Sequence, residues 1–321
     1  MTENYFQGYV YDQQIIDDNV QSFAANGVDL NPTTLLGTTK RKIAEGITYE
    51  NLRDFEVEYL RSTGQQTGRK ISQSGIFEKI LQATGICVGC AYHDSQWVNW
   101  CARFITSGDV PAPKELTLCG PYLLGRANLR GDNGAYPSYS ARGFYDYGAL
   151  TVEDMCKILG YNAGIMDTAG QEAIAIKFRD NFKFNNKFLD AMAPYKGRVY
   201  QPADQWAMAD CIANFYSVTV GMGSQISETN PHSNGISGWY TLNGGHETFC
   251  DGWFTLKGKL GFLKSESWGK FPSTNWRDNR VTLLTDSGPK LLYPGQGACW
   301  ADELMAKRPE LWANGYPTSN S

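Results

Sequence analysis

The hydrophobic pattern of the chain changes its period near residue 216, and this change constrains the fold more than any other feature. Before that point apolar residues recur at helical spacing, as they do after Cys90. From residue 216 to 222 they alternate and are β-branched, which is typical of a strand. Chains that separate helices from antiparallel strands form two layers with room for a cleft between them. We therefore expect an α+β fold in which a helical half packs on an antiparallel sheet.

Local patterns predict the elements of both halves. Helical spacing covers residues 48–61, 76–82, 139–147, 170–184 and 204–214, together with segments that begin at Cys90 and Thr151. Thr151, with Asp154 three residues later, is a capping-box-like start signal. The sheet half is expected to contain strands near 216–222, 240, 247–254 and 260–264, a long polar loop over 223–237 and a tight hairpin at 257–259.

Charge and composition exclude several classes of function. The 321 residues are 42% hydrophobic and 19% charged, and the formal net charge is −4. We therefore expect no basic face and no nucleic-acid partner. No apolar run has the length of a membrane span, and no cleavable-looking secretory leader opens the chain. The sequence predicts no cofactor.

Eight cysteines and three histidines limit the available metal and redox chemistry. Cys87 and Cys90 form a CxxC pair, but a second pair with metal-ligand spacing is missing, which argues against a structural zinc site. The βαβ surroundings of a thioredoxin-type motif are not visible either. A redox or metal role for the pair stays as a minor alternative.

Thiol nucleophilic catalysis needs a base and a group that orients the base. A turn-like GICVG run precedes Cys90 and places it in the first turn of a helix, where the helix dipole lowers the pKa of a thiol. The alternative interpretation of Cys90 is a small apolar residue in a buried helix. His246, which follows two glycines, is the candidate base, and Glu266 is the candidate orienting group.

Four local patterns in the same order resemble the papain-like cysteine peptidases over roughly residues 80 to 275. The segment 87–92, CVGCAY, resembles the family's CGSCWAF around the nucleophile. The other three are the NGAYP segment at 133–137 with Tyr147-Gly148, Gly245-His246 with Gly252-Trp253, and the LKSESWG segment at 263–269, which is similar to VKNSWG. The resemblance implies a papain-like fold, divergent and of bacteriophage or bacterial origin.

The resemblance assigns catalytic and substrate-binding roles. Cys90 would be the attacking thiolate, His246 the base and then the acid, and Trp268 a cover over the histidine. The backbone of Gly134 and Ala135 would pair with an extended peptide substrate. Pro137 and Gly245 would border the pocket next to the scissile bond.

The sequence departs from the family pattern at the catalytic positions. Glu266 replaces the orienting asparagine, and its charge should favour imidazolium and keep the thiol–imidazole pair ionised. Thr84 occupies the slot of the glutamine that completes the oxyanion hole, and Gln82 is the possible substitute. The loss of one such donor costs about 10²–10³ in rate. Glu247 stands where the family has a small residue.

A further departure concerns location. Asp132 replaces the family's cysteine that would pair with the equivalent of Cys87, so that this disulfide cannot form with that partner. With the missing leader, this predicts a cytoplasmic or virion-associated protein rather than a secreted one.

Two functions from different classes follow. The first is a papain-like thiol hydrolase that cleaves peptide bonds in peptide or protein substrates. The second is a catalytically weak or inactive structural or interaction protein with the same fold, such as a phage virion component. We expect a papain-like domain over 71–286, an N-terminal extension over 1–70 that acts as a docking arm or inhibitory segment, and a C-terminal extension over 287–321 packed on the domain. The extensions could dock on protein partners in an assembly.

Overall fold

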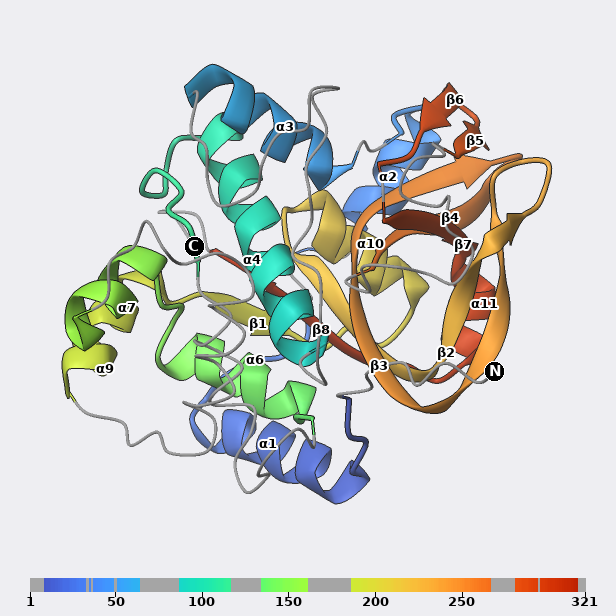
Figure 1. The fold of residues 1–321 in the computed structure, drawn as a ribbon. Coiled ribbons are helices and arrows are strands. Elements are labelled where there is room, and N and C mark those ends of the chain that lie inside the picture. The colour runs from blue at the N-terminus through green and yellow to red at the C-terminus, as the bar shows by residue number, and fades with distance from the viewer. Residues whose placement is uncertain are drawn as a thin grey trace.

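The structure is a computed structural model that describes residues 9–32, 35, 37–48, 51–63, 87–116, 134–160, 186–266, 281–293 and 295–316, with the backbone alone for 227–231, 240 and 243. Most of the described helices lie on one side of the molecule, and a curved sheet lies on the other with α2 (Thr38–Ala44), α10 (Gln205–Ala213) and α11 (Ala301–Ala306) beside it (Figure 1). α4 (Cys87–Thr106) runs between the two sides. The α+β prediction is confirmed, because the helix that carries the cysteine pair packs on an antiparallel sheet.

The helical elements begin and end close to the predicted positions wherever the prediction falls on described residues. The predicted helices at 48–61, 139–147, 151 onward and 204–214 correspond to α3, α6, α7 and α10, whereas 76–82 and 170–184 lie outside the described residues. The bounds are α1 (Gln13–Ala25), α2 (Thr38–Ala44), α3 (Leu52–Thr63), α6 (Pro137–Asp146), α7 (Val152–Leu159), α9 (Asn186–Met192), η2 (Ala193–Tyr195), α10 (Gln205–Ala213) and α11 (Ala301–Ala306).

Side-chain caps define where several helices start. The Thr151 hydroxyl accepts a hydrogen bond from the Asp154 amide at 3.1 Å, which confirms the predicted capping signal of α7. Asp204 caps α10 by accepting from the amides of Trp206 and Ala207, each at 2.8 Å. Asp12 caps α1 in the same way. Such caps satisfy amides that have no partner inside the helix.

The described strands form a six-stranded sheet and a separate hairpin. The sheet has the order β1-β8-β2-β3-β4-β7, and every pairing is antiparallel. β5 (Thr282–Thr285) and β6 (Gly288–Leu291) pair with each other. The bounds of the sheet strands are β1 (Arg198–Tyr200), β2 (Ser217–Pro231), β3 (Ser237–Leu256), β4 (Lys259–Ser265), β7 (Gln296–Trp300) and β8 (Glu310–Gly315). β8, which comes from the predicted C-terminal extension, lies inside the sheet between β1 and β2.

The predicted polar loop over 223–237 is wrong. β2 continues to Pro231 and β3 begins at Ser237, so that only a short turn separates them. The pairing moves from Met222–His246 to Ser224–Thr241 across a bulge in β3. A long hairpin satisfies its backbone by pairing with itself, so that polar side chains did not prevent strand formation. The predicted hairpin at 257–259 is confirmed, with Lys257 and Gly258 both at positive φ.

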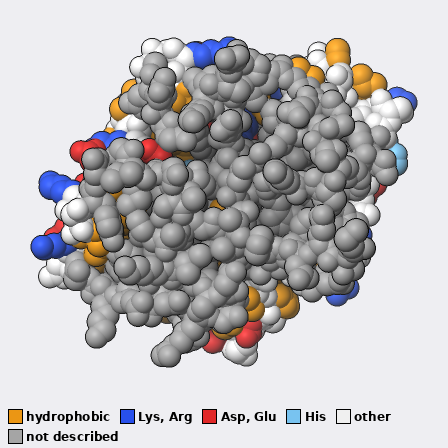
Figure 2. Space-filling view, viewed as in Figure 1, with side chains coloured by type: hydrophobic (Ala, Val, Ile, Leu, Met, Phe, Trp, Pro, Cys, Tyr) orange, Lys and Arg blue, Asp and Glu red, His pale blue; other side chains and the backbone are white. Residues whose placement is uncertain are grey.

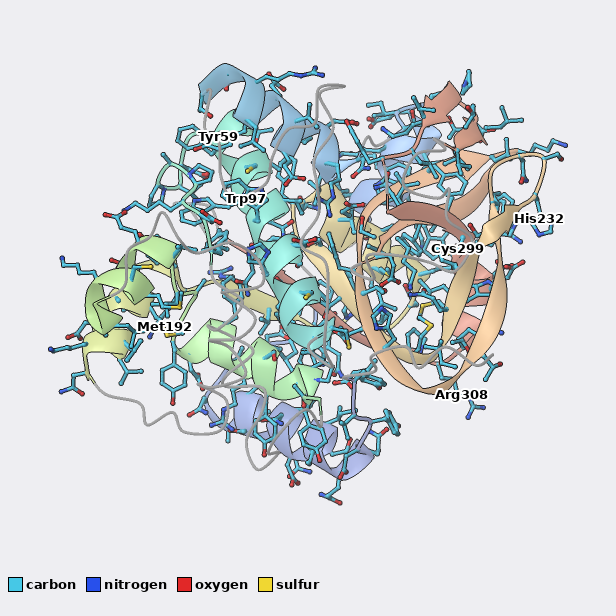
Figure 3. All side chains as sticks on the ribbon, in the orientation of Figure 1. Tyr59, Trp97, Met192, His232, Cys299 and Arg308 are labelled. Atoms are coloured by element: carbon cyan, nitrogen blue, oxygen red, sulfur yellow. The ribbon has the colours of Figure 1, made fainter. Side chains whose placement is uncertain are left out.

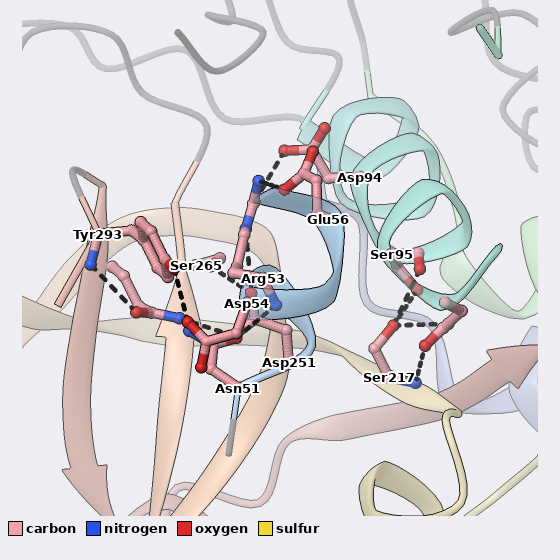
Figure 4. Close-up of polar contacts among 12 residues, drawn as sticks. Asn51, Arg53, Asp54, Glu56, Asp94, Ser95, Ser217, Asp251, Ser265 and Tyr293 are labelled. Carbon is pink, nitrogen blue, oxygen red and sulfur yellow. Dashed lines mark hydrogen bonds and ion pairs between the residues drawn. The ribbon is translucent and has the colours of Figure 1, made fainter. Parts of the chain in front are cut away.

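A buried ion network joins α3, α4 and the sheet (Figure 4). The Arg53 guanidinium contacts Glu56 at 2.8 Å, Asp94 at 3.4 Å and Asp251 at 3.1 Å. All four side chains are almost completely buried. A second polar cluster joins Ser95 of α4 to Ser217 of β2. These contacts fix the position of α4 on the sheet.

The surface charges and the hydrophobicity of the helices can be compared with the composition for the described residues. Acidic and basic side chains are interspersed where described side chains appear at the edge of the face in Figure 2. None of the helices in the described ranges is both long and apolar enough to cross a membrane.

Candidate active site

The CxxC pair lies at the start of α4. Residues 87–89, which were predicted as part of a turn, are helical, and Cys90 lies in the same described helix, Cys87–Thr106. Glycine inside a helix costs about 1 kcal/mol relative to alanine, a cost that burial of the neighbouring side chains can offset. Cys87, Val88 and Cys90 are all buried in one apolar cluster with Tyr92 of the same helix. The sequence pattern alone did not reveal that this turn of the helix is buried.

Cys87 is the thiol that contacts the strand of the candidate base. Its sulfur accepts a hydrogen bond from the backbone N–H of Glu247 at 3.4 Å, directly after His246. In the sequence, Cys87 stood out only as the first member of the CxxC pair, and Cys90 was the predicted nucleophile.

His246 and Glu266 lie together as the sequence analysis predicted. The imidazole Nε2 is 2.6 Å from the Glu266 carboxylate oxygen Oε1, and both side chains are buried. Burial is the largest influence on the pKa of His246 and lowers it, Glu266 raises it, and Lys264 lowers it, so that the net direction is down. Glu266 thus acts toward imidazolium as expected, but burial and Lys264 together outweigh it.

Two further side chains extend this pair into the sheet. The Gln225 amide Nε2 donates to the second oxygen of Glu266, and the Lys264 ammonium donates to Gln225 Oε1. Both side chains are buried. Neither residue was a sequence-based candidate, because Gln225 lay in a predicted polar loop, Lys264 was an ordinary polar residue of a predicted strand, and their partners are distant in the chain.

The segment at Tyr9 and Val10 bridges the two predicted substrate-binding segments. The Tyr9 amide donates to the Gly245 carbonyl at 3.4 Å, and the Val10 amide donates to the Ala135 carbonyl at 3.1 Å. Tyr9 forms a parallel bridge with Ala135 and an antiparallel bridge with Gly245. Tyr9 and Val10 therefore join these two segments through backbone hydrogen bonds.

The Tyr9 ring fills a pocket whose walls are glycines. A Cβ atom on Gly245 would lie 2.3 Å from Tyr9 Cδ1, and one on Gly221 would lie 2.5 Å from Tyr9 Cε2. Only residues without a side chain leave room for the ring there. Glu247 and Glu310 border the same pocket, and the Tyr9 hydroxyl hydrogen-bonds to Glu310.

The two carboxyl groups of this pocket are buried and disfavour ionisation. Burial, followed by the neighbouring Glu310, raises the pKa of Glu247 well above its ordinary value. The Thr219 hydroxyl faces Glu247 but donates to the Trp312 carbonyl at 3.3 Å. Burial raises the pKa of Glu310 to about 7, although its carboxylate accepts from the Trp312 indole at 2.8 Å.

The remaining predicted site residues are distributed as follows. Gly134 has a positive φ of 81° beside the Tyr9 segment, and Pro137 begins α6, where its carbonyl accepts from the Tyr92 hydroxyl at 3.0 Å. Thr84, Gln82 and Trp268 lie outside the described residues. His232 is exposed near the β2–β3 turn, at the outer edge of the sheet half and far from α4 (Figure 3). Across the described ranges, no group of three or more His, Cys, Asp or Glu side chains is arranged to hold a metal ion.

The comparisons with known proteins give similarity in three dimensions only. No protein-family model and no curated protein matches the sequence. Xylellain, a cysteine protease from Xylella fastidiosa, matches with 15% identity and a TM-score of 0.46 over 78% of this chain and 85% of that one. Digestive procathepsin L 3 of Tenebrio molitor larval midgut matches with 13% identity and a TM-score of 0.41 over 94% and 90%. ProCathepsin B S9 from Trypanosoma congolense matches with 14% identity and a TM-score of 0.35 over 79% and 77%.

Proposed function

We propose that the protein is a papain-like thiol hydrolase that cleaves peptide bonds. The observation that carries this proposal is the buried His246–Glu266 pair on a strand whose next amide contacts a thiol at the start of a helix. The contact brings a thiol against the strand that carries the base, beside the group that orients the base. This supports the proposal, because thiol nucleophilic catalysis needs these three groups near one another.

The geometry supports a division of roles. When Nε2 of His246 donates to Glu266, Nδ1 is left as the acceptor that can take a thiol proton. Its lowered pKa keeps the imidazole neutral at pH 7 and therefore able to act as a base. The thiolate would attack the substrate carbonyl, and the protonated imidazole would return the proton to the leaving amine. The Glu247 contact supports Cys87 as the attacking group, with Cys90 one turn away as the second candidate.

Substitution of each thiol tests the proposal. We expect His246→Ala and one of Cys87→Ala or Cys90→Ala to abolish hydrolysis of a mixed library of quenched fluorescent peptides. Cys101→Ala, a matched control on the same buried helix, should retain hydrolysis. Iodoacetamide at about pH 6, with the site of labelling read by mass spectrometry, should modify the active thiol before the others. Hydrolysis that survives both thiol substitutions would refute the proposal.

The predicted inhibitory role of the N-terminal segment is supported by the position of Tyr9. The segment pairs with Ala135, whose backbone is expected to pair with substrate, and with Gly245, which is expected to border the pocket next to the scissile bond. Tyr9, Cys87 and Cys90 also belong to the same buried cluster. The peptide substrate and the segment would therefore compete for one groove.

Removal of the Tyr9 ring tests this competition in the full chain. Tyr9→Ala should raise both the rate of peptide hydrolysis and the rate of thiol labelling, because the ring no longer holds the segment in the pocket. Tyr11→Ala is the matched control, since Tyr11 lies two residues away and is 56% exposed. Equal rates for the two variants would contradict the inhibitory role.

The second candidate function is an inactive protein with this fold. It is supported by the burial of both thiols, since Cys87 is 0% and Cys90 is 1% exposed. The same labelling experiment separates the two candidates. A thiol that stays unreactive in Tyr9→Ala would favour the structural role.

A further inference from the structure

We propose that Gln225 and Lys264 are positioning residues for the base, and that through Glu266 they hold the His246 imidazole and set its affinity for a proton. The inference rests on the proposed function only in taking His246 as the base. Three of the four side chains come from neighbouring strands, with Gln225 on β2, His246 on β3 and Lys264 on β4. Glu266 directly follows β4 in the chain.

The hydrogen bonds form a continuous chain. Glu266 uses one carboxylate oxygen for His246 Nε2, at 2.6 Å, and the other for the Gln225 amide Nε2. Gln225 Oε1 accepts from the Lys264 ammonium and, at 3.0 Å, from the backbone N–H of Ile226. Two donors at Oε1 and an acceptor at Nε2 leave a single orientation for the amide. Gln225 is therefore held from both ends, and it holds Glu266 in turn.

The chain is buried, and its charges balance. Gln225 is 0%, Lys264 2% and Glu266 3% exposed. A buried ammonium or carboxylate is costly unless an opposite charge lies close. With His246 neutral, Lys264 and Glu266 sum to zero, and the glutamine amide joins them. An isolated ionised glutamate at this position would instead favour imidazolium.

Lys264 thus allows Glu266 to serve as an orienting group without locking a proton on the imidazole. The charge of Lys264 lowers the pKa of His246, whereas Glu266 raises it, so that Lys264 opposes the effect of Glu266. The Lys264 charge also lowers the pKa values of Glu247, Cys250 and Cys299 in the same sheet, and the buried Asp251 carboxylate accepts a hydrogen bond from Ser265, the next residue of β4. On α4, Cys87 contacts the backbone of β3, the strand that carries His246.

The test measures the protonation midpoint of His246 by NMR in protein labelled with ¹⁵N-histidine. The chain has three histidines, and the His246 signals are assigned by their loss in His246→Asn. Lys264→Met should raise the midpoint by about one pH unit or more, because Glu266 is left uncompensated. Glu266→Gln should lower it. Lys259→Met, on the same strand with a side chain that is 45% exposed, should leave it unchanged.

The double variant Lys264→Met/Glu266→Gln keeps the proposal falsifiable if a single variant does not fold. It removes both charges together, so that it should fold better than either single variant and should restore the midpoint to near the wild-type value. An unchanged midpoint in Lys264→Met, or a double variant no better than the singles, would overturn the proposal. Because the midpoint is read without turnover, its failure leaves the proposed hydrolase untouched. Shifted midpoints without peptide hydrolysis in any variant would refute only the hydrolase.

Discussion

Glu247 and Glu310 project from neighbouring positions of the sheet, since Gly221 of β2 pairs with both residues. The Tyr9 ring lies over that glycine, and its hydroxyl meets Glu310. Each carboxyl group raises the cost of ionising the other, in addition to the cost of burial. At the scale of single residues, the surroundings of the Tyr9 ring therefore favour the protonated forms of Glu247 and Glu310.

Stability should therefore fall as pH rises. The pKa of Glu310 is about 7 in the folded protein against an ordinary value of 4.5, so that the folded state holds more protons between these values. The stabilisation is fully present below pH 4.5 and is lost as pH rises through about 7, an effect on the order of 3 kcal/mol. We expect the urea midpoint to drop from pH 5 to pH 8.

The dependence on pH should be smaller in Glu310→Gln, which cannot ionise. The residual dependence belongs to Glu247, whose pKa is shifted in the same direction. Glu153→Gln, at a side chain that is 73% exposed, should behave as wild type. If the urea midpoints of wild type and Glu310→Gln changed with pH in the same way, Glu310 would have an ordinary pKa in the folded protein.

Gly221 should be sensitive to a single added methyl group. In Gly221→Ala the new Cβ would lie 2.5 Å from both Glu247 Oε2 and Tyr9 Cε2. Overpacking of this kind costs about 1–3 kcal/mol, and we expect the Tyr9 segment to give way first. Hydrogen exchange at the Val10 amide should then accelerate by about 10- to 100-fold.

Gly223→Ala on the same strand is the matched control for this substitution. A Cβ there meets its nearest neighbour at 3.7 Å, which is an ordinary contact. If both alanine variants left the Val10 amide equally protected, the position of the Tyr9 ring would not depend on the absence of a side chain at Gly221.

At the scale of elements, α4 is held by polar contacts as well as by apolar packing. Arg53 of α3 pairs with Asp94 of α4 and Asp251 of β3, so that one guanidinium joins three elements (Figure 4). The position of the cysteine pair relative to His246 depends on this junction, because both belong to elements that meet there. Buried networks of this kind bring specificity only while every member is paired.

Loss of the guanidinium should be strongly destabilising. Arg53→Leu leaves three buried carboxyl groups without their common partner, and removing one member of a buried pair costs about 3–5 kcal/mol. The control is Arg41→Leu, whose exposed pair with Glu45 should contribute less than about 1 kcal/mol. Urea unfolding measures both. A cost for Arg53→Leu as small as that of the control would mean that the network is solvated.

At the scale of the whole molecule, the C-terminal residues complete the main sheet. β8 pairs with β1 and β2, and the Trp312 side chain is fully buried. We therefore expect the amides of β8 to exchange only through global unfolding, at the slowest rate in the protein. The amides of β5 and β6, a hairpin that exposes Leu284 and Leu291, should exchange faster. Fast exchange in β8 would instead indicate a detachable C-terminal extension.

Local sequence determined much of the fold. The caps of α7 and α10, the hairpin at Lys257 and the change to strand periodicity are all visible in the sequence, because each depends on neighbours a few residues apart. The polar loop expected at 223–237 was wrong for the complementary reason, since the pairing of β2 with β3 satisfies backbone groups whatever the side chains.

The residues of the candidate site also fall into those that the local sequence reveals and those that it does not. His246 and Glu266 could be selected from motif and residue type, whereas Cys87, the Gln225–Lys264 chain and the Tyr9 pocket could not. Gln225 and Lys264 are 39 positions apart and Cys87 is 160 positions from Glu247, while the glycines that contact the Tyr9 ring lie farther still along the chain. The sequence by itself determined which chemical groups are available and which local elements carry them. Only the tertiary structure decided which groups are neighbours and which are removed from water, and these two conditions set the pKa values on which the proposed chemistry depends.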